Sequence, residues 1–248
     1  MRGFDHFSKQ AKEYSQYRPN YPNELYKFLL SCVKERNTVW DCATGNGQAA
    51  IALSEYFDKV IATDLSLSQL KHAVEKSNIN YYESVAESTP IKSDSINLIT
   101  IAQALHWFNF NDFYKEVYRV GKTDGIIAAW CYGQCTVSKE VDEICNYFFH
   151  DVLKEFWPKQ STFIREEYKT IPFPFEKIDA PVFYMTEEWN LDEFVGYQYT
   201  WSATQRYIIE LGNNPLLPIY NKYKRVWGEP EKRLKVIWPI HMLVGKIK

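Results

Sequence analysis

Short apolar runs alternate with amphipathic stretches along the first half of the chain. The apolar runs predict strands at Val39–Trp40, Val60–Ala62, Ile79–Tyr82, Ile96–Ile101 and Ile126–Trp130. The stretches between them predict helices at Gln48–Phe57, Ser68–Ser77 and Asp112–Val120. Asn111 can cap the start of the third helix and Gly121 can close its end. Strands that alternate with helices in this way form a parallel sheet covered on both faces.

The segment ahead of this region is rich in aromatic side chains and contains two prolines. Over residues 5–30, Pro19 and Pro22 forbid one continuous helix. We therefore expect a short helix at Ser8–Tyr14, then a rigid turn, then a helix at Asn23–Val33.

The second half of the chain has a different texture. Glu140–Trp157 carries apolar side chains at helical spacing, which predicts an amphipathic helix. Residues 157–227 are crowded with Trp, Tyr, Phe and Pro, which indicates a mostly helical insertion. Val182–Thr186 is read as a strand that returns to the sheet. The end of the chain is read as a final strand or a hairpin, with apolar runs at Val236–Trp238 and His241–Ile247.

Length and charge exclude several classes of protein. The 248 residues are enough for a full core, as one domain or as a domain with a substantial insertion. A formal net charge of −2, without long runs of like charge, argues against a nucleic-acid partner. No apolar stretch approaches the roughly 20 residues of a membrane helix, and residues 1–5 start no signal peptide. We expect no membrane partner and a monomer or weak homodimer.

The cysteines indicate a reducing compartment. Their number is odd, and no second ligand pair lies near Cys131 and Cys135. Free thiols in the cytoplasm therefore explain them better than a disulfide framework or a zinc site. The five are Cys32, Cys42, Cys131, Cys135 and Cys145.

The stretch 41–47, Asp-Cys-Ala-Thr-Gly-Asn-Gly, carries the chemistry of the first half. It reads as a tight turn between a strand and a helix, and Gly45 and Gly47 let the backbone adopt positive φ and approach a ligand closely. The helix start behind them offers unpaired N–H groups. Asp64 ends the next apolar run, where a carboxylate can accept hydrogen bonds from two ribose hydroxyls. This unit predicts a site for a nucleoside cofactor.

The identity of that cofactor depends on the residues around the two glycines. A dinucleotide site shows G-x-G-x-x-G, but here Ala43 takes the place of a glycine ahead of Gly45, and Ala50 stands at the third glycine position counted from Gly45 and Gly47. Asp41 would repel the pyrophosphate of NAD, whereas it suits the positively charged amino-acid end of S-adenosylmethionine. The absence of Gly-Lys-Ser/Thr excludes a phosphate-binding P-loop.

On these residues the chain resembles the class I S-adenosylmethionine-dependent methyltransferases. Residues 41–47 match the glycine loop of that family, and Asp64–Ser66 matches its acidic ribose-binding corner. Ala86–Glu87 matches the position that meets the adenine edge through backbone or carboxyl side chain. Ser95–Thr100 matches its fourth strand, except that Asn97 stands where an acid is usual.

Narrower features resemble the trans-aconitate methyltransferase-like (methyltransferase type 11) group. Proteins of that group methylate small carboxylic acids or have no assigned substrate. The stretches that carry this resemblance are Tyr14–Pro22, Ala102–Phe108, Trp201–Ala203, Trp238–Pro239 and Val244–Gly245.

The resemblance implies a fold and a division of the chain. The expected fold is α/β: a Rossmann-like, doubly wound, mostly parallel seven-stranded sheet with a helical, aromatic-rich cap insertion. Residues 1–34 would cover the cofactor and residues 35–133 would form the S-adenosylmethionine-binding core. Residues 134–235 would form the helical cap and acceptor region with one returning strand, and residues 236–248 the final sheet strand.

The resemblance also implies a set of site residues. Tyr14, Tyr17 and Arg18 are expected to fold over the methionine end of the cofactor, whose carboxylate suits an arginine and whose sulfonium suits an aromatic face. The full cofactor-binding set is Tyr14, Tyr17, Arg18, Asp41, Ala43, Gly45, Gly47, Asp64, Leu65, Ser66, Gln69, Ala86, Glu87, Gln103 and Ala104.

His106 and Trp107 are the candidate catalytic residues. They follow the fourth strand at the sheet edge where open α/β sheets place their ligands. Whether His106 acts as a general base stays open, because a carboxylate acceptor needs no deprotonation near neutral pH. Some aromatic side chains of the second half are expected to line an apolar acceptor pocket, from among Trp130, Trp157, Trp189, Tyr197, Tyr199 and Trp201.

The leading functional hypothesis is metal-free O-methylation of a small carboxylic acid by S-adenosylmethionine. A first alternative is an N- or hydroxyl-directed small-molecule methyltransferase in which His106 acts as base. Two others are a cofactor-binding protein without turnover and an NAD-dependent oxidoreductase, the latter disfavoured by Asp41 and Ala43.

Overall fold

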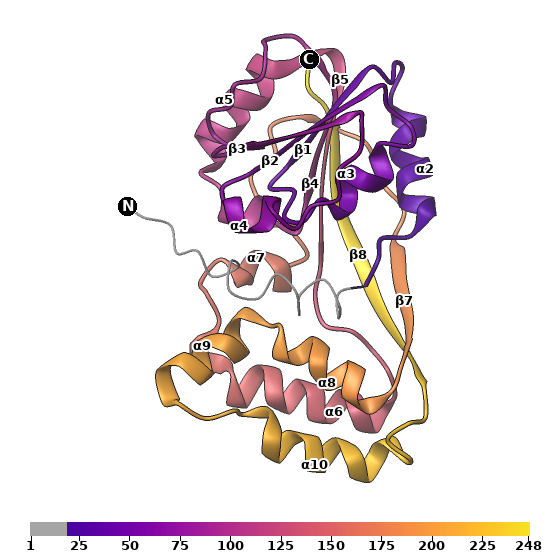
Figure 1. Ribbon diagram of the computed structural model, residues 1–248, viewed down its shortest axis with the longest axis vertical. Coiled ribbons are helices and arrows are strands. Elements are labelled where there is room, and N and C mark those ends of the chain that lie inside the picture. The colour runs from indigo at the N-terminus through magenta and orange to yellow at the C-terminus, as the bar shows by residue number, and fades with distance from the viewer. Residues whose placement is uncertain (1–18) are drawn as a thin grey trace.

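In the computed structural model, which describes residues 19–248, a mixed sheet forms one end of the molecule and a group of helices forms the other (Figure 1). The sheet has eight strands in the order β3-β2-β1-β4-β5-β8-β6, and β7 also pairs with β8. Strands β1 to β5 pair in parallel, whereas β8 runs antiparallel to β5, β6 and β7. The strands are β1 (Thr38–Cys42), β2 (Lys59–Asp64), β3 (Ile79–Glu83), β4 (Ile96–Ala102), β5 (Gly121–Tyr132), β6 (Glu176–Lys177), β7 (Phe183–Trp189) and β8 (Leu234–Lys246).

Helices cover both faces of the parallel part of the sheet. Helices α2 (Asn23–Cys32) and α3 (Gln48–Leu53) lie on one face, and α5 (Phe110–Val120) lies on the other. The short helix α4 (Leu67–Leu70) lies below β3 in Figure 1. Side chains alternate between two buried clusters along β1 and β5, so that Val39 joins α2 and α3 while Trp40 packs with α5. The architecture is therefore doubly wound, as predicted.

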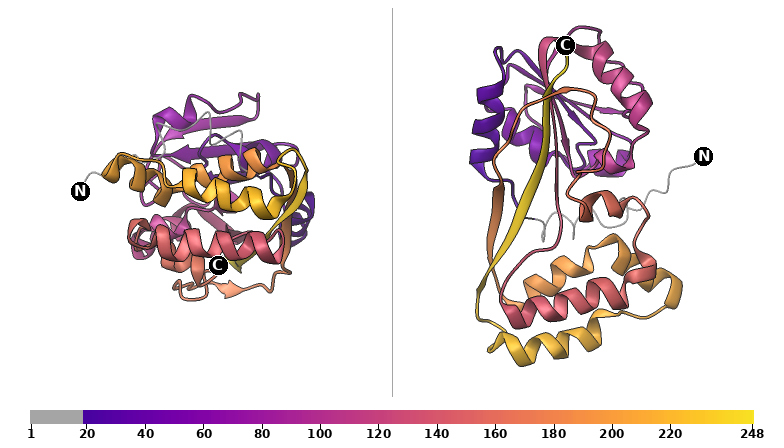
Figure 2. Two further views of the ribbon diagram at one scale, coloured as in Figure 1. Left: turned by 90° about the horizontal axis from the view of Figure 1, so that it is seen from below. Right: turned by 180° about the vertical axis from the view of Figure 1, so that it is seen from behind.

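Strand β8 connects the sheet to the helical end, which we call the cap. Its second half pairs with β5 from Ile240 to Lys246, and its first half pairs with β7 from Leu234 to Ile240. The β7–β8 ribbon extends beyond the end of β5 and leads into the cap (Figure 2, right). Because β8 pairs with both β5 and β7, it fixes the position of the cap relative to the sheet.

The cap is formed by helices packed through aromatic side chains. In the view from below, α6 and the helices α8 to α10 lie across the end of the molecule (Figure 2, left). Phe194 packs against Tyr223 and Trp227 with ring centroids 5.3 Å apart in both pairs. The elements of the second half are α6 (Lys139–Tyr147), the π-turn η2 (Phe148–Val152), the 3-10 turn η3 (Lys154–Phe156), α7 (Ser161–Arg165), α8 (Leu191–Tyr199), α9 (Ser202–Leu211) and α10 (Leu216–Trp227).

The structure confirms the predicted strands and corrects several boundaries. The helix predicted at Ser68–Ser77 shrinks to the four residues of α4, because residues 71–77 bury no apolar stripe and Val74 is 54% exposed. Asn109, not Asn111, caps α5 by accepting a hydrogen bond from the Asp112 amide at 3.3 Å. Gly121 ends that helix in an extended conformation.

Two further expectations change in the second half. The amphipathic run Glu140–Trp157 is not one helix, because α6 gives way to η2 and η3. The end of the chain is one long strand, not a hairpin, and the sheet has eight strands, not seven, because two-residue β6 also pairs with β8. The helix expected at Ser8–Tyr14 lies outside the described residues. No helix among residues 19–248 is long and apolar enough to cross a membrane.

Candidate active site

The glycine loop joins β1 to α3 through alternating positive φ angles. Ala43, Gly45 and Gly47 have φ of 53°, 59° and 87°. At Gly45 a side chain would meet no atom within 4 Å, so the loop leaves room for a ligand against this backbone. At Gly47 a Cβ would lie 2.5 Å from the hydroxyl oxygen of Tyr81, so this glycine serves close packing against β3.

Asp64 lies at the end of β2 and holds the glycine loop in place. Its carboxylate accepts hydrogen bonds from the backbone N–H of Gly45 and of Ser66, both at 2.8 Å. The side chain is partly exposed at the carboxyl end of β2. It therefore fits the ribose of a nucleoside cofactor beside the open space at Gly45.

Asp41 lies at the same sheet edge but has a different environment. Its two carboxylate oxygens accept hydrogen bonds from the hydroxyls of Thr44 at 2.5 Å and Thr100 at 2.8 Å. Burial raises the pKa of Asp41 to about 6. The side chain thus braces β1 against β4 and against the glycine loop, and direct contact with the cofactor stays a prediction.

The turn after β2 supplies three more of the predicted residues. Leu65 is exposed, whereas Gln69 is buried. The hydroxyl of Ser66 caps α4 by accepting a hydrogen bond from the Gln69 amide at 3.3 Å. The Ser66 cap holds the turn next to Asp64 in place, and the apolar side chain of Leu65 stays exposed beside it.

The loop after β3 holds the residues predicted for the adenine edge. Ala86 is buried, and the carboxylate of Glu87 accepts a hydrogen bond from the backbone N–H of Asn109 at 2.9 Å. Glu87 therefore ties this loop to the start of α5. The backbone would then make the contact with adenine. The sequence alone had left open whether the backbone or the carboxyl side chain makes it.

Gln103 and Ala104 leave the end of β4. The Gln103 amide donates to the Tyr132 carbonyl at 2.8 Å and accepts from the Tyr132 N–H at 3.1 Å, with its own φ at 57°. This pair extends the contact between β4 and β5 past the last backbone hydrogen bond. Ala104 is buried directly before the 3-10 turn η1 (Leu105–Trp107).

His106 and Trp107 lie on η1 at the carboxyl ends of the strands. His106 is buried, and its Nδ1 lies 2.9 Å from the hydroxyl of Tyr168. Burial lowers the pKa of His106 to about 3, so the ring is neutral at physiological pH and a weak base. Trp107 is 40% exposed, with its ring centroid 5.0 Å from that of His106.

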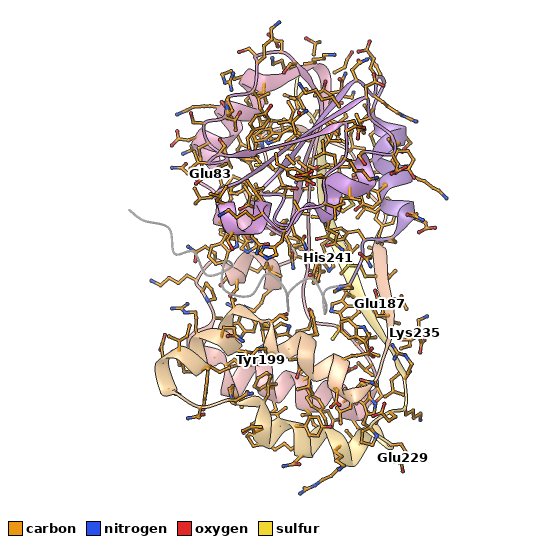
Figure 3. The ribbon with its side chains drawn as sticks, in the orientation of Figure 1. Glu83, Glu187, Tyr199, Glu229, Lys235 and His241 are labelled. Carbon is orange, nitrogen blue, oxygen red and sulfur yellow. The ribbon has the colours of Figure 1, made fainter. Side chains whose placement is uncertain are left out.

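Sequence reasoning missed the loop that follows α7. Glu167 and Tyr168 both have positive φ, at 57° and 61°, although neither is glycine or asparagine. Tyr168 contacts His106, and the Glu167 carboxylate lies 3.6 Å from Nδ1 of His241 on β8. Figure 3 shows His241 close to the carboxyl ends of the parallel strands. No turn residue in this stretch of sequence signals the contact.

The remaining candidates are divided between the core and the surface. Trp130, Trp189, Tyr197 and Trp201 are buried, whereas Trp157 and Tyr199 are partly exposed. Tyr14, Tyr17 and Arg18 lie outside the described residues. Among residues 19–248, no group of three or more His, Cys, Asp or Glu side chains could hold a metal ion. The metal-free reaction stays a prediction.

Asn97 lies at the opposite end of the sheet from these residues. Its side-chain oxygen accepts a hydrogen bond from the backbone N–H of Thr38 at 3.1 Å, where β1 begins. The side chain also lies 3.4 Å from Glu35 and from Lys122. Asn97 therefore lies away from the residues at the carboxyl ends of the strands.

Fold and site together define a Rossmann-like nucleoside-cofactor protein, and comparisons identify its family. The methyltransferase-domain family matches residues 40–129. A protein of Dictyostelium discoideum named as a methyltransferase is 31% identical over 98% of this chain and 95% of its own length. The chain belongs to the class I S-adenosylmethionine-dependent methyltransferases, and S-adenosylmethionine is its cofactor.

Solved structures agree with this assignment. A structure from Anaeromyxobacter dehalogenans, described as a type II methyltransferase, is 35% identical, covers 93% of this chain and 98% of its own, and has a TM-score of 0.87. A methyltransferase structure from Bacillus halodurans shares the fold at 18% identity, covering 91% of this chain and 99% of its own, with a TM-score of 0.51. Neither of these relatives, nor the Dictyostelium protein, is named for trans-aconitate, so that narrower resemblance stays a prediction.

Proposed function

We propose that this methyltransferase O-methylates a small carboxylic acid in the cytoplasm. The observation that carries the proposal is the state of His106, which is buried, contacts Tyr168 and has a pKa lowered to about 3. A hydroxyl acceptor must lose its proton during transfer, and so must a protonated amine. A weak base in this position cannot remove that proton efficiently. A carboxylate is already ionised at neutral pH and needs no base.

The chemistry requires alignment more than proton transfer. When bound, S-adenosylmethionine supplies a methyl group on a sulfonium, which is a good leaving group. The acceptor oxygen forms a bond to the methyl carbon while the carbon–sulfur bond breaks, and the electron pair goes to sulfur. Orientation of this kind supplies about 7–11 kcal/mol of the barrier. Asp64 and Gly45 would hold the cofactor, and Trp107 would orient the acceptor and exclude water.

Two further observations support the proposal. All five cysteines are free, which fits a reducing compartment. The partly exposed Trp157 and Tyr199 belong to the cap, whose apolar side chains suit a small acceptor better than a macromolecule.

The test is a pH–rate profile measured on a panel of small acids, with alcohols and amines as matched acceptors. We expect turnover on acids, and no loss of kcat/KM as the pH falls from 8 through the ordinary histidine pKa near 6.5. Replacing Trp107 with Ala should lower kcat/KM far more than it weakens binding of S-adenosylhomocysteine. Turnover restricted to alcohols or amines, with a rate limb near pH 6.5, would contradict the proposal.

A further inference from the structure

The loop that joins β3 to β4 begins beside the predicted ribose site. Residues 84–95 form this loop within the described part of the chain. The backbone N–H of Ser84 donates to the carbonyl of Asp64 at 3.0 Å. Residues 85–88 then make a tight turn, closed by a bridge between its first and last residues. Because β3 is the neighbour of β2 on the side away from β1, this turn lies next to Asp64 on the side away from the glycine loop.

A buried carboxylate on α5 holds this loop. Oε1 of Glu116 accepts hydrogen bonds from the backbone N–H of Thr89 at 2.7 Å and from the Thr89 hydroxyl at 2.6 Å. Burial acts to raise the pKa of Glu116, but hydrogen bonds from Arg119 and Thr89 hold that pKa below its usual value. The side chain is only 6% exposed, so its charge depends on these partners.

Arg119 completes the network from the same helix. Its guanidinium donates to both carboxylate oxygens of Glu116, at 2.6 and 2.7 Å. It also donates to the backbone carbonyls of Thr89 at 3.1 Å and of Ile91 at 2.7 Å. The two side chains thus bind both the N–H and the C=O groups of the loop, as a neighbouring strand would. They fix the path of a backbone that has no strand beside it.

Helix α5 also holds the tip of the turn. The carboxylate of Glu87 accepts from the backbone N–H of Asn109, the N-cap residue of α5, at 2.9 Å. The helix therefore fastens the loop at two points, at its start through Glu87 and further along through Glu116. The carboxylate of Glu87 is engaged in this contact, so the backbone groups of the turn are the ones left to meet a ligand.

The order of the strands would place the base of the cofactor at this turn. The sheet edge runs from the turn after β3, past Asp64 and Gly45, to His106 after β4. A ribose held by Asp64 has its base on one side and the methyl group on the other. The methyl group must face the candidate catalytic residues, so the base faces the turn. Leu65, 59% exposed next to Asp64, offers an apolar surface for the flat face of the base.

We propose that Glu116 and Arg119 position the turn 85–88 against adenine and thereby set the preference of the enzyme for that base without touching the cofactor. The inference rests on the cofactor and not on the nature of the acceptor. Adenine presents an N–H donor and a ring-nitrogen acceptor along one edge. Backbone C=O and N–H groups match that edge only in a narrow range of positions, because hydrogen bonds weaken steeply with distance and angle. Glu116 is therefore a positioning residue for base recognition.

The test compares binding of S-adenosylhomocysteine and S-inosylhomocysteine by calorimetric titration. The second ligand has a carbonyl oxygen and a ring N–H where adenine has its donor and acceptor, so it reverses the edge that the turn meets. We expect the wild type to prefer the adenine ligand about 100-fold, since two hydrogen bonds are mismatched in the other ligand. Glu116→Gln should reduce that preference about 10-fold, because it removes the charge and one of the two acceptor oxygens that hold the loop. Its affinity for the inosine ligand should stay within about twofold, since that base gains nothing from the position of the turn.

Thr89→Val tests the same contact from the loop. It keeps the volume and the backbone N–H of Thr89 but removes the hydroxyl that donates to Glu116. The preference for the adenine ligand should fall about 3- to 5-fold, less than in Glu116→Gln, because the backbone bond remains.

A control variant separates positioning from packing. Val120→Ala truncates a buried side chain at the last residue of α5 and should lower the Tm. Its preference for the adenine ligand should stay within about twofold of the wild type, since the bonds of Glu116 and Arg119 to the loop remain.

Three results would overturn the inference. Equal binding of both ligands by the wild type would show that the turn does not read the base. A preference unchanged in both Glu116→Gln and Thr89→Val would show that the pair does not set it. A loss in Val120→Ala as large as in Glu116→Gln would assign the effect to general stability. None of these measurements uses a methyl acceptor, so a failure of the proposed function would leave the inference standing.

Discussion

Two aspartates at neighbouring strand ends show how burial divides roles between identical side chains. Asp64 is partly exposed and accepts from two backbone N–H groups, whereas Asp41 is buried and accepts from two hydroxyls. The first arrangement leaves a carboxylate accessible at the end of β2. The second raises the pKa of Asp41 to about 6. Sequence alone placed both residues at the site but could not distinguish their environments.

Asp64→Ala should weaken binding of S-adenosylhomocysteine about 10- to 100-fold, because it removes charge-assisted hydrogen bonds worth about 1.5–3 kcal/mol. Calorimetric titration measures the change. Glu83→Ala is the control, since Glu83 ends the adjacent strand in register with Asp64 and is exposed at the edge of the sheet (Figure 3). Equal affinity in Asp64→Ala and the wild type would remove the ribose assignment.

Asp41→Asn should stabilise the protein above pH 6. The folded-state pKa of about 6 lies above the usual 3.8, so the folded state binds the proton more tightly and wild-type stability falls as the pH rises from about 4 to 6. The variant avoids that loss, which is up to about 3 kcal/mol. Urea unfolding at pH 4 and pH 7.5 measures it. A variant that is equally destabilised at both pH values would show that the hydroxyl contacts require the charge.

At the scale of elements, the glycine loop has one glycine that borders free space and one that packs against another strand. Gly45 borders free space, whereas Gly47 is in contact range of Tyr81, so the two glycines serve different needs. The spacing of the motif predicted the loop and its positive φ angles. It could not predict that Tyr81, far along the chain on β3, would pack against one of the two.

Gly45→Val should abolish binding of S-adenosylhomocysteine while the protein stays folded, because the side chain fills the ligand's space and strains φ at +59°. Gly47→Ala should instead lower the Tm, since its Cβ would displace the Tyr81 hydroxyl. Tyr81→Phe should restore part of that loss in the double variant. Normal binding by Gly45→Val would mean that the site lies elsewhere.

The sequence predicted long, strongly patterned elements well and isolated contacts poorly. Strands β1, β4 and β5 follow from short apolar runs that are buried on both faces. Helix α4 is shorter than predicted because its continuation, residues 71–77, buries no apolar stripe. The contact of His106 with Tyr168 joins residues 62 positions apart through a loop without turn residues. No local pattern encodes such a contact.

At the scale of the whole molecule, β8 connects the cofactor-binding sheet to the cap. The second half of β8 pairs with β5 and its first half pairs with β7. The same strand therefore belongs to the cofactor-binding sheet and to the ribbon that leads into the cap. A final strand was predictable from its apolar runs, but its division between two partners depends on tertiary pairing. Tyr132 pairs with Ile240 but Thr136 pairs with Ile237, so the β5 side carries one extra residue, a β-bulge, at this transition.

Trp201→Ala should destabilise the cap by about 3–5 kcal/mol, the usual cost of truncating a buried tryptophan. Its ring lies 5.7 to 6.0 Å from those of Phe148, Phe149, Trp157 and Tyr197. Denaturant unfolding measures the loss. Ile209→Ala, at a side chain 74% exposed on the neighbouring helix, should change stability by less than about 0.5 kcal/mol. Similar values for both variants would mean that Trp201 is not part of the cap core.

The chemical nature of the methylated product tests the account most directly. The enzyme is supplied with S-adenosylmethionine carrying a labelled methyl group and a panel of small acids, alcohols and amines, and the products are then treated with mild alkali. Methyl esters hydrolyse under these conditions and release labelled methanol, whereas methyl ethers and methylamines do not. We predict that the label is incorporated into acids and released by alkali. Label that survives alkali, on an alcohol or an amine, would contradict methylation of a carboxylic acid.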